Sequence, residues 1–155
     1  MNTLCWRSPL GPILLEEEGG AVTGLRFCGQ EVPAQGPVSP VLAQAAAQLA
    51  EYFAGQRQSF TVPLAPRGTP FQQEVWRALC AIPYGQTRSY GQLAAALGRP
   101  SAARAVGGAC RRNPIWLMIP CHRVVGASGS LTGYAGGLER KKALLALEQG
   151  QAVQP

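Results

Sequence analysis

The sequence predicts an α/β protein in two parts, a small β-rich N-terminal domain at residues 1–67 and a mainly helical C-terminal domain at residues 68–155. Three observations predict this division. Apolar runs with turn residues between them dominate residues 1–35, helical patterns with start and stop signals follow residue 68, and the charge changes sign at a Pro- and Gly-rich connector. Hydrophobic residues make up 46% of the chain, enough for a packed core and too many for a disordered protein.

The N-terminal part is expected to contain a hairpin, a helix and a short strand. In GPILLEEEGGAVTGLRF, two apolar runs flank Gly19 and Gly20, a turn signal that predicts the hairpin. In VSPVLAQAAAQLAEYFAG, Ser39 and Pro40 mark the start of a helix and Gly55 marks its end. The stretch QSFTVPLAPRGTP is typical of a short strand that leads into the connector.

The C-terminal part is expected to begin with three helices that have the character of a helix-turn-helix. The first, in TPFQQEVWRALCAI, starts at Pro70. The second, in SYGQLAAALG, starts at Ser89, and Gln92 completes a capping-box pattern. The third, in RPSAARAVGGACRR, is expected to open with Pro100 and Ser101.

The rest of the chain is expected to form a strand, a loop and a last helix. PIWLMIPCHRVV has the pattern of an apolar strand broken at Pro120, and GASGSLTGYAGG is a glycine-rich loop. LERKKALLALE predicts the last helix, and we expect Lys141 and Lys142 on its solvated face rather than at phosphates.

The third helix is unusually rich in small residues, because it consists mostly of alanine and glycine with arginines at its rim. Helix interiors do not normally favour a Gly-Gly pair. One interpretation is tight packing of this helix against the core. The other is close approach to DNA, where bulky side chains would block a groove, and the distribution of charge favours it.

The net charge of +6 is concentrated in the second part of the chain. Residues 1–60 hold three basic and five acidic side chains, a net charge of −2, whereas residues 61–155 hold eleven and three, a net charge of +8. A basic half indicates a polyanionic partner, with nucleic acid ahead of a membrane, although a solubilising surface would give the same count. Neither a secretory signal nor a membrane-spanning run is predicted, so we expect an intracellular protein, cytoplasmic or, in a eukaryote, nuclear.

The five cysteines are expected to be reduced, because their number is odd and no secretory signal is predicted. No pair of them forms a C-x-x-C motif and the chain has one histidine, so we predict no metal site and no cofactor. One cysteine is therefore available for chemistry.

The sharpest candidate is Cys121, in the motif Pro120-Cys121-His122-Arg123. Cysteine is a strong nucleophile only as the thiolate, and a neighbouring imidazole and guanidinium both favour that form. Adjacent side chains on an extended chain point to opposite faces, so Cys121 and His122 are expected to communicate through a water or through a bend at Pro120. The alternative is an inert, buried cysteine at the end of an apolar strand.

The surroundings of this motif resemble the methylated-DNA–protein-cysteine alkyltransferase family. The similarity is carried by FQQEVWRALCAIPYGQTRSYGQLAAALGRPSAARAVG and by RAVGGACRRNPIWLMIPCHRVVGASGSLTGYAGGLERKKALLALE. PCHRV, with Asn-Pro before it and G-x-L-x-G-Y after it, is a highly specific combination. The resemblance implies a variable, ribonuclease H-like domain at residues 1–67 and a DNA-binding alkyltransferase domain at residues 68–155.

The resemblance also implies the catalytic roles. Cys121 matches the acceptor, which attacks the alkyl carbon and keeps the group as a thioether. His122 matches the base that draws the thiol proton through water, and Glu148 matches the carboxylate that orients His122. Tyr90 matches the phenol that donates a hydrogen bond to the leaving guanine, and Asn113 matches the side chain that braces the turn before the cysteine.

The implied DNA contacts lie on the third helix and around the pocket. Arg104 matches the arginine that fills the gap left in the stack when the damaged nucleotide is flipped out. The other implied contacts to DNA or to the guanine are the Val124 carbonyl, the Ala135 N–H, Ser101, Ala102 and Gly107. Ala135 stands where some members of the family carry serine, which matters little if the contact is made by the backbone. Cys110, on the same helix, is either a spectator or a second, minor target of alkylation.

The expected function is repair of O6-alkylguanine, with O4-alkylthymine as a possible second substrate, by one irreversible transfer to Cys121. The partner implied is double-stranded DNA bound through its minor groove, and we expect a monomer that does not bind membranes. One rival is a damage sensor that flips the base without accepting the alkyl group. The other is a cysteine hydrolase with a small acyl substrate, which would leave the basic second half unexplained.

Overall fold

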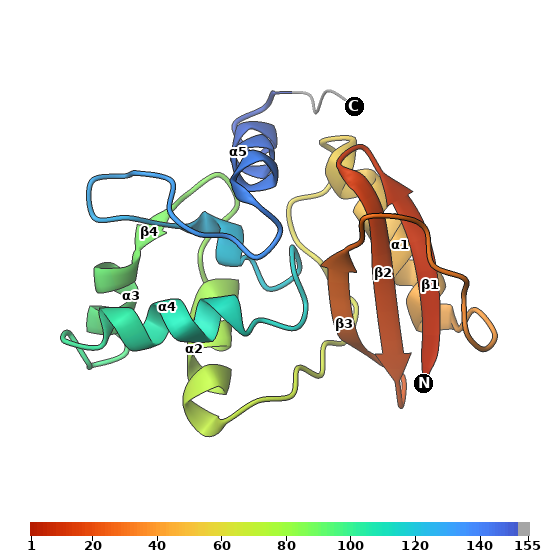
Figure 1. The fold of residues 1–155 in the computed structure, drawn as a ribbon, viewed down its shortest axis with the longest axis horizontal. Coiled ribbons are helices and arrows are strands. Elements are labelled where there is room, and N and C mark those ends of the chain that lie inside the picture. The colour runs from red at the N-terminus through yellow and green to blue at the C-terminus, as the bar shows by residue number, and fades with distance from the viewer. Residues whose placement is uncertain (152–155) are drawn as a thin grey trace.

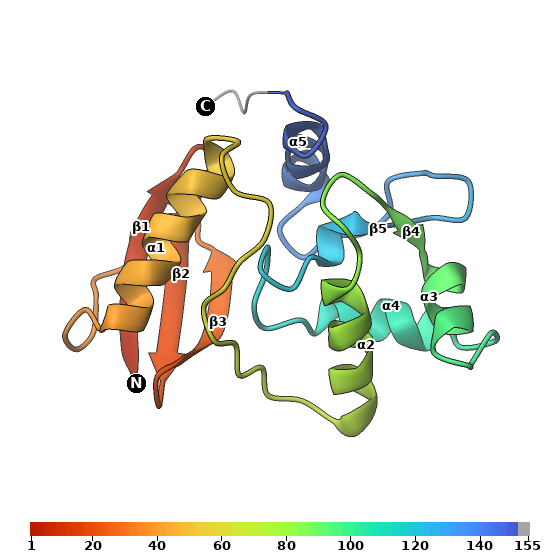
Figure 2. The same cartoon turned by 180° about the vertical axis from the view of Figure 1, so that it is seen from behind.

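The computed structural model describes residues 1–151, and its N-terminal part is a sheet covered by one helix (Figure 1). Strands β1 (Asn2–Ser8), β2 (Gly11–Glu18) and β3 (Ala21–Phe27) form an antiparallel sheet in that order. Helix α1 (Pro40–Phe53) lies across one face of this sheet, as the reverse view shows (Figure 2). Its buried side chains fill the space between helix and sheet.

Local signals explain why these elements form where they do. Gly19 and Gly20 both adopt positive φ, as a two-residue turn between twisted strands requires, so the predicted hairpin is confirmed as β2–β3. The predicted helix is also confirmed, because the side chain of Ser39 accepts a hydrogen bond from the N–H of Leu42 and caps α1. The strand expected in QSFTVPLAPRGTP is wrong. Only an isolated bridge to Val22 forms there, since the prolines leave too few backbone donors for a ladder.

In the C-terminal part, as described to residue 151, four helices surround a very short sheet. The capping box predicted from Ser89 and Gln92 is present at the start of α3, and a second one, from Thr69 and Gln72, opens α2. Helices α3 and α4 pack against each other as a helix-turn-helix. The elements are α2 (Pro70–Cys80), β4 (Arg88–Ser89), α3 (Tyr90–Ala96), α4 (Ala103–Arg111), the 3-10 turn η1 (Cys121–Arg123), β5 (Val124–Val125) and α5 (Leu138–Leu147).

Two sequence predictions in this part need correction. Helix α4 begins at Ala103, not at Pro100 or Ser101, because the chain first makes a turn in which the Ala102 N–H donates to the carbonyl of Arg99. The apolar run 114–125 is not a strand. It contains a turn with Leu117 at positive φ and then η1, and only its last two residues pair, in parallel, with β4.

The two parts share one hydrophobic core and a backbone connection. The N–H of Leu25 on β3 donates to the carbonyl of Pro114, and the N–H of Trp116 donates to the carbonyl of Leu25. Buried side chains form a continuous cluster that includes residues of α1, β3, α2 and α5. The segment before the cysteine turn is therefore anchored to the N-terminal sheet. Among the described residues, no helix is long and apolar enough to cross a membrane.

Candidate active site

Cys121 is placed by a tight turn rather than by a strand. Pro120 precedes η1, and the N–H of Cys121 donates to the carbonyl of Ile119. The bend expected at Pro120 is present: Cys121 and His122 lie in one 3-10 turn and both are buried. The turn allows the two adjacent side chains to project into different surroundings, the thiol toward a pocket and the imidazole toward α5.

Asn113 holds this turn from within, at the end of α4. Its Nδ2 donates to the carbonyl of Ile119, 2.8 Å away, and lies 3.2 Å from the sulfur of Cys121. Its Oδ1 accepts a hydrogen bond from the N–H of Ile115, 2.9 Å away. The carbonyl of Ile119 and the N–H of Ile115 belong to buried residues and need hydrogen-bond partners. The Asn113 side chain supplies them in place of a neighbouring strand.

His122 forms a buried pair with Glu148, the residue that follows α5. The distance from His122 Nε2 to Glu148 Oε2 is 2.7 Å, and both side chains are almost completely buried. Arg123 completes the cluster, since its Nε donates to Oε1 at 2.8 Å and its Nη2 to Oε2 at 3.1 Å. The third donor is the hydroxyl of Tyr52, 2.6 Å from Oε2. Oε2 is thus the acceptor shared by all three side chains.

These contacts set the protonation states of the pair. Burial alone would raise the pKa of Glu148, but hydrogen bonds from His122, Arg123 and Tyr52 lower it to about 2, so Glu148 is ionised. Burial lowers the pKa of His122 and outweighs the opposite effect of Glu148, so the imidazole is neutral near pH 7. An ionised Glu148 fixes the tautomer with the proton on Nε2. Nδ1 then carries the lone pair, and it has no hydrogen-bond partner within residues 1–151.

The thiol of Cys121 is not activated by its environment in this state. Burial raises its pKa to about 11, although the hydrogen bond from Asn113 and the charge of Lys141 lower it somewhat. Cys121 is therefore protonated near pH 7, and a base is needed when it reacts. The imidazole of the adjacent His122 is neutral, so it can accept the thiol proton as a base.

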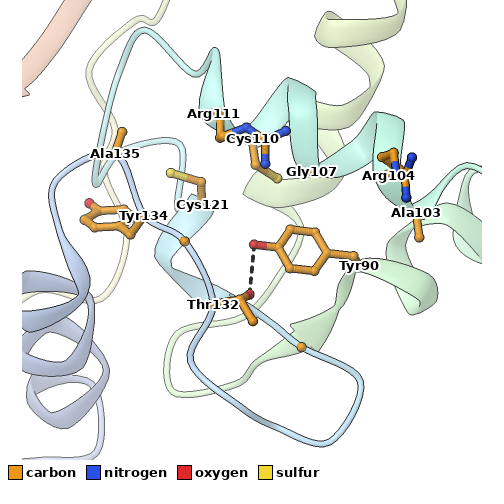
Figure 3. Close-up of a pocket in the computed structure, with 12 residues that line it drawn as sticks. Tyr90, Ala103, Arg104, Gly107, Cys110, Arg111, Cys121, Thr132, Tyr134 and Ala135 are labelled. Carbon is orange, nitrogen blue, oxygen red and sulfur yellow. Dashed lines mark hydrogen bonds between the residues drawn. The ribbon is translucent and has the colours of Figure 1, made fainter.

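Cys121 lies at a pocket of about 370 Å³ between α3, α4 and the loop that precedes α5 (Figure 3). Tyr90 projects its phenol into this pocket from α3, and its oxygen accepts a hydrogen bond from Thr132, 3.3 Å away. Cys110 also lines the pocket, and burial raises its pKa to about 12. Of the residues predicted for the site, the pocket is lined by Tyr90, Arg104, Gly107, Cys121 and Ala135.

The remaining predicted residues lie behind the pocket or beside it. His122, Asn113 and Glu148 are buried behind Cys121. Ser101 is exposed and Ala102 is half-buried, both just before α4. The carbonyl of Val124 already accepts a hydrogen bond from Lys141, although a carbonyl oxygen has a second lone pair for another donor.

Sequence reasoning missed Tyr52 and misassigned Arg123 and Lys141. Arg123 was expected to favour the thiolate of Cys121, but its guanidinium binds Glu148 instead. The solvated position expected for Lys141 is wrong: its side chain is buried, and its ammonium donates to carbonyl oxygens of the pocket loop. In the fold, Lys141 shares a helical face with the buried Leu144 and Glu148, although the sequence of α5 has too weak a periodicity to show which face is buried. For Tyr52, which lies 96 positions from its partner, the sequence offered no signal.

The structure confirms one of the two interpretations of the small residues of α4, packing against the core. Val106, Gly107, Ala109 and Cys110 are buried, so one face packs against the core. On the other face Arg104 and the arginines that follow Cys110 are exposed. A Cβ on Gly107 would lie 3.7 Å from the ring of Tyr90, so glycine keeps that side of the pocket open.

Comparison with known proteins matches both parts of the chain to domains of one family. Residues 70–150 match the family model for the DNA binding domain of 6-O-methylguanine DNA methyltransferase, and residues 4–66 match the model for its ribonuclease-like domain. The methylated-DNA–protein-cysteine methyltransferase of Mycobacterium tuberculosis is 52% identical over 94% of this chain and 90% of that protein. That of Methanosarcina acetivorans is 49% identical over 92% and 95%. The crystal structure of Mycobacterium tuberculosis OGT in complex with DNA matches with a TM-score of 0.87 and 50% identity, covering 96% of this chain and 92% of that one.

Proposed function

Because this chain belongs to the 6-O-methylguanine DNA methyltransferase family, we propose that it repairs DNA by moving the alkyl group of O6-alkylguanine irreversibly onto its own Cys121. Its activity class is that of a methylated-DNA–[protein]-cysteine S-methyltransferase. The single observation that carries the proposal is the position of Cys121, with its thiol in a pocket and a neutral, carboxylate-bound histidine behind it. The matched segments support a division into a ribonuclease-like domain at residues 1–67 and a DNA-binding domain at residues 68–155.

The chemical step needs a base, because the thiol of Cys121 is protonated at neutral pH. Nδ1 of His122 takes the thiol proton through a water, while the ionised Glu148 accepts a hydrogen bond from Nε2–H and stabilises the imidazolium that forms. The sulfur attacks the alkyl carbon in line, a C–S bond forms and the C–O6 bond breaks with its electron pair going to the guanine. Tyr90 donates a hydrogen bond to the guanine ring, so the purine does not leave as a bare anion. Asn113 keeps the sulfur in place.

Each protein molecule carries out this transfer once, because Cys121 stays alkylated. A thioether is not cleaved by any group that lines the pocket, so no free thiol is regenerated. The protein is therefore a single-turnover acceptor that combines the specificity of an enzyme with the stoichiometry of a reagent.

The pocket takes a base that has left the helix. An O6 substituent inside a duplex is out of reach of a buried thiol, and flipping the nucleotide exposes it at a cost of a few kcal/mol of stacking and pairing. Arg104 is exposed at the outer edge of the pocket, where its guanidinium can occupy the gap in the stack. The backbone of Val124 and Ala135 recognises the guanine edge. A pocket of about 370 Å³ is of the size that holds a small ligand.

The surface that meets DNA is the exposed face of α4. Small side chains beside arginines suit a narrow minor groove, which a bulky helix could not enter. Ser101 and Ala102 lie in the turn just before α4, at the edge of this surface. The Ala102 N–H already donates to the carbonyl of Arg99, so the backbone N–H and the hydroxyl of Ser101 are the groups that can meet a phosphate. Gly107 faces the pocket. The protein acts on double-stranded DNA as a monomer.

The test is intact-mass measurement after the protein is mixed with duplex DNA that contains one O6-methylguanine, followed by peptide mapping. We expect one methyl group in place of the thiol hydrogen, on the peptide that contains Cys121, with never more than one per molecule. Cys110→Ser should behave like the wild type, and Cys121→Ser should bind the duplex without a mass change. A duplex with O4-methylthymine tests the second substrate.

Binding of the wild type without transfer would overturn the mechanism in favour of a damage sensor. DNA-independent turnover of a small thiol ester would instead favour a cysteine hydrolase.

A further inference from the structure

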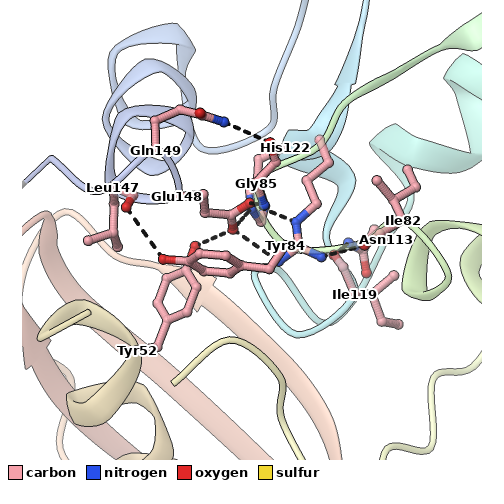
Figure 4. A network of polar contacts seen from close by, with 11 residues as sticks. Tyr52, Ile82, Tyr84, Gly85, Asn113, Ile119, His122, Leu147, Glu148 and Gln149 are labelled. Carbon is pink, nitrogen blue, oxygen red and sulfur yellow. Dashed lines mark hydrogen bonds and ion pairs between the residues drawn. The ribbon is translucent and has the colours of Figure 1, made fainter. Parts of the chain in front are cut away.

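The catalytic carboxylate is held by both parts of the chain. Glu148 follows α5 and belongs to the C-terminal part, as do His122 and Arg123. Tyr52 lies on α1, in the N-terminal part, and its hydroxyl donates to Glu148 Oε2 over 2.6 Å, the shortest of the contacts to this carboxylate (Figure 4). The N-terminal part therefore contributes a donor to the same oxygen atom that accepts the hydrogen bond from Nε2–H of His122.

Tyr52 is built into the core so that its hydroxyl has a fixed position. The residue is fully buried, and its ring packs edge-on against Phe53 and Tyr84 and obliquely against Phe60. Burial raises the pKa of Tyr52 well above its ordinary value, and the negative charge of Glu148 acts in the same direction. The phenol is therefore always a donor, and Glu148 is its acceptor.

A hydrogen bond to this oxygen has two consequences for His122. It fixes the orientation of the carboxylate, and it spreads the negative charge that Oε2 presents to the imidazole. If this donor is removed, the charge on Oε2 is concentrated on His122, and the imidazolium form gains stability. The pKa of His122 should then rise, and a smaller fraction of the imidazole would be neutral and able to act as a base.

We propose that Tyr52 is a positioning residue for the transfer reaction, through which the N-terminal domain sets the orientation of Glu148 and the basicity of His122. The inference rests on the proposed function, because it assigns His122 as the base. It makes the N-terminal sheet and α1 part of the machinery that activates Cys121, rather than only a support for it.

The test is Tyr52→Phe, which removes one oxygen and leaves the packed ring in place. We expect the second-order rate constant for methyl transfer from a duplex with O6-methylguanine to fall roughly tenfold, the lower end of the effect seen when hydrogen bonds that orient metal-bound histidines are removed. The acidic limb of the pH–rate profile should move to higher pH. The matched control is Tyr84→Phe, whose hydroxyl meets the carbonyl of Leu147 rather than the carboxylate.

A second readout does not depend on the transfer reaction. His122 is the only histidine of the chain, so the imidazole 15N resonances of a labelled sample report on it alone. In the wild type and in Tyr84→Phe we expect a neutral ring with the proton on Nε2. In Tyr52→Phe the titration midpoint should move to higher pH. If the wild type itself fails to accept a methyl group, the proposed function fails, but this shift still tests the coupling.

Three results would overturn the inference. One is a Tyr52→Phe variant with the rate and pH profile of the wild type. Another is a loss of rate in both Tyr52→Phe and Tyr84→Phe that in each variant is proportional to that variant's loss of stability. The third is an unchanged titration midpoint of His122, which would reduce Tyr52 to a packing residue.

Discussion

The ammonium of Lys141 lies 2.5 Å from the carbonyl oxygen of Val124, in the interior of the protein. The same nitrogen also donates to the carbonyls of Thr132 at 2.7 Å and Gly133 at 3.4 Å. One side chain on α5 thus ties the strand after the cysteine turn to the loop that lines the pocket. Burial lowers the pKa of Lys141 from its ordinary value.

The contacts of Lys141 predict that Lys141→Met lowers both stability and activity. Methionine fills similar space but leaves the buried carbonyl of Val124 without this donor, which costs about 1–3 kcal/mol in the free energy of unfolding. The loop at residues 126–137 also loses its anchor, so the rate of methyl transfer should fall. Urea unfolding and a rate measurement check both effects. Lys142→Met, at an exposed position of the same helix, should change neither, and equal behaviour of the two variants would contradict this role.

Most of the fold could be predicted because the signals that set it are local. Gly19 with Gly20, and Ser89 with Gln92, specify a turn and a helix start through contacts within a few residues. The segment 114–125 could not be predicted, because its apolar composition is equally compatible with a strand. The side chain of Asn113 takes up backbone groups that a strand would have paired, and β3 takes up others.

The site divides in the same way. Cys121 and His122 could be predicted as site residues because a cysteine beside a histidine is a recognisable reactive pair. Glu148 could be predicted only from the resemblance to the family. Tyr52 and Lys141 were missed because their roles come from tertiary contacts. A buried cation that donates to carbonyls cannot be told from a solvated one by composition, since only the fold decides what surrounds it.

Asn113 should control the acidity of the acceptor thiol. Its Nδ2 lies 3.2 Å from the sulfur and lowers the pKa of Cys121 against the effect of burial. Asn113→Ala should therefore raise that pKa above its value of about 11 and leave the N–H of Ile115 unpaired. The rate of iodoacetamide alkylation of Cys121 against pH, followed by peptide mass, measures the change.

The control for this substitution is Asn2→Ala, on β1, whose amide pairs with Glu17 at the far edge of the sheet. It should leave the alkylation profile of Cys121 unchanged. If the thiol titrates at the same pH in Asn113→Ala as in the wild type, the hydrogen bond does not tune it.

Glu148 should make the protein sensitive to acid. Its pKa is about 2 in the folded state against an ordinary value of 4.5, so the folded state binds its proton less readily than the unfolded chain does. The stability that this difference contributes is present above about pH 4.5 and is lost as the pH falls toward about 2. The shift corresponds to about 3 kcal/mol. Urea unfolding of the wild type from pH 7 to pH 3 should show this loss.

The comparison for this prediction is Glu148→Gln, which cannot titrate at this position. It should be the less stable protein at pH 7, because Arg123 is left buried without its counter-charge. The difference between the two proteins should narrow as the pH falls below about 4.5. A constant difference across that range would mean that Glu148 is not ionised in the folded protein.

Arg104 should matter for DNA and not for chemistry. It is exposed at the edge of the pocket on α4 and forms no ion pair with the described residues, so Arg104→Ala should leave the melting temperature unchanged. Transfer from a duplex should slow by roughly tenfold or more, since flipping costs a few kcal/mol that Arg104 partly offsets. Transfer from the free O6-methylguanine base needs no flipping and should proceed at the wild-type rate.

The matched control is Arg77→Ala, which replaces an exposed arginine on α2 and should leave both transfer rates unchanged. Equal losses with duplex and free base would place Arg104 in the pocket chemistry instead.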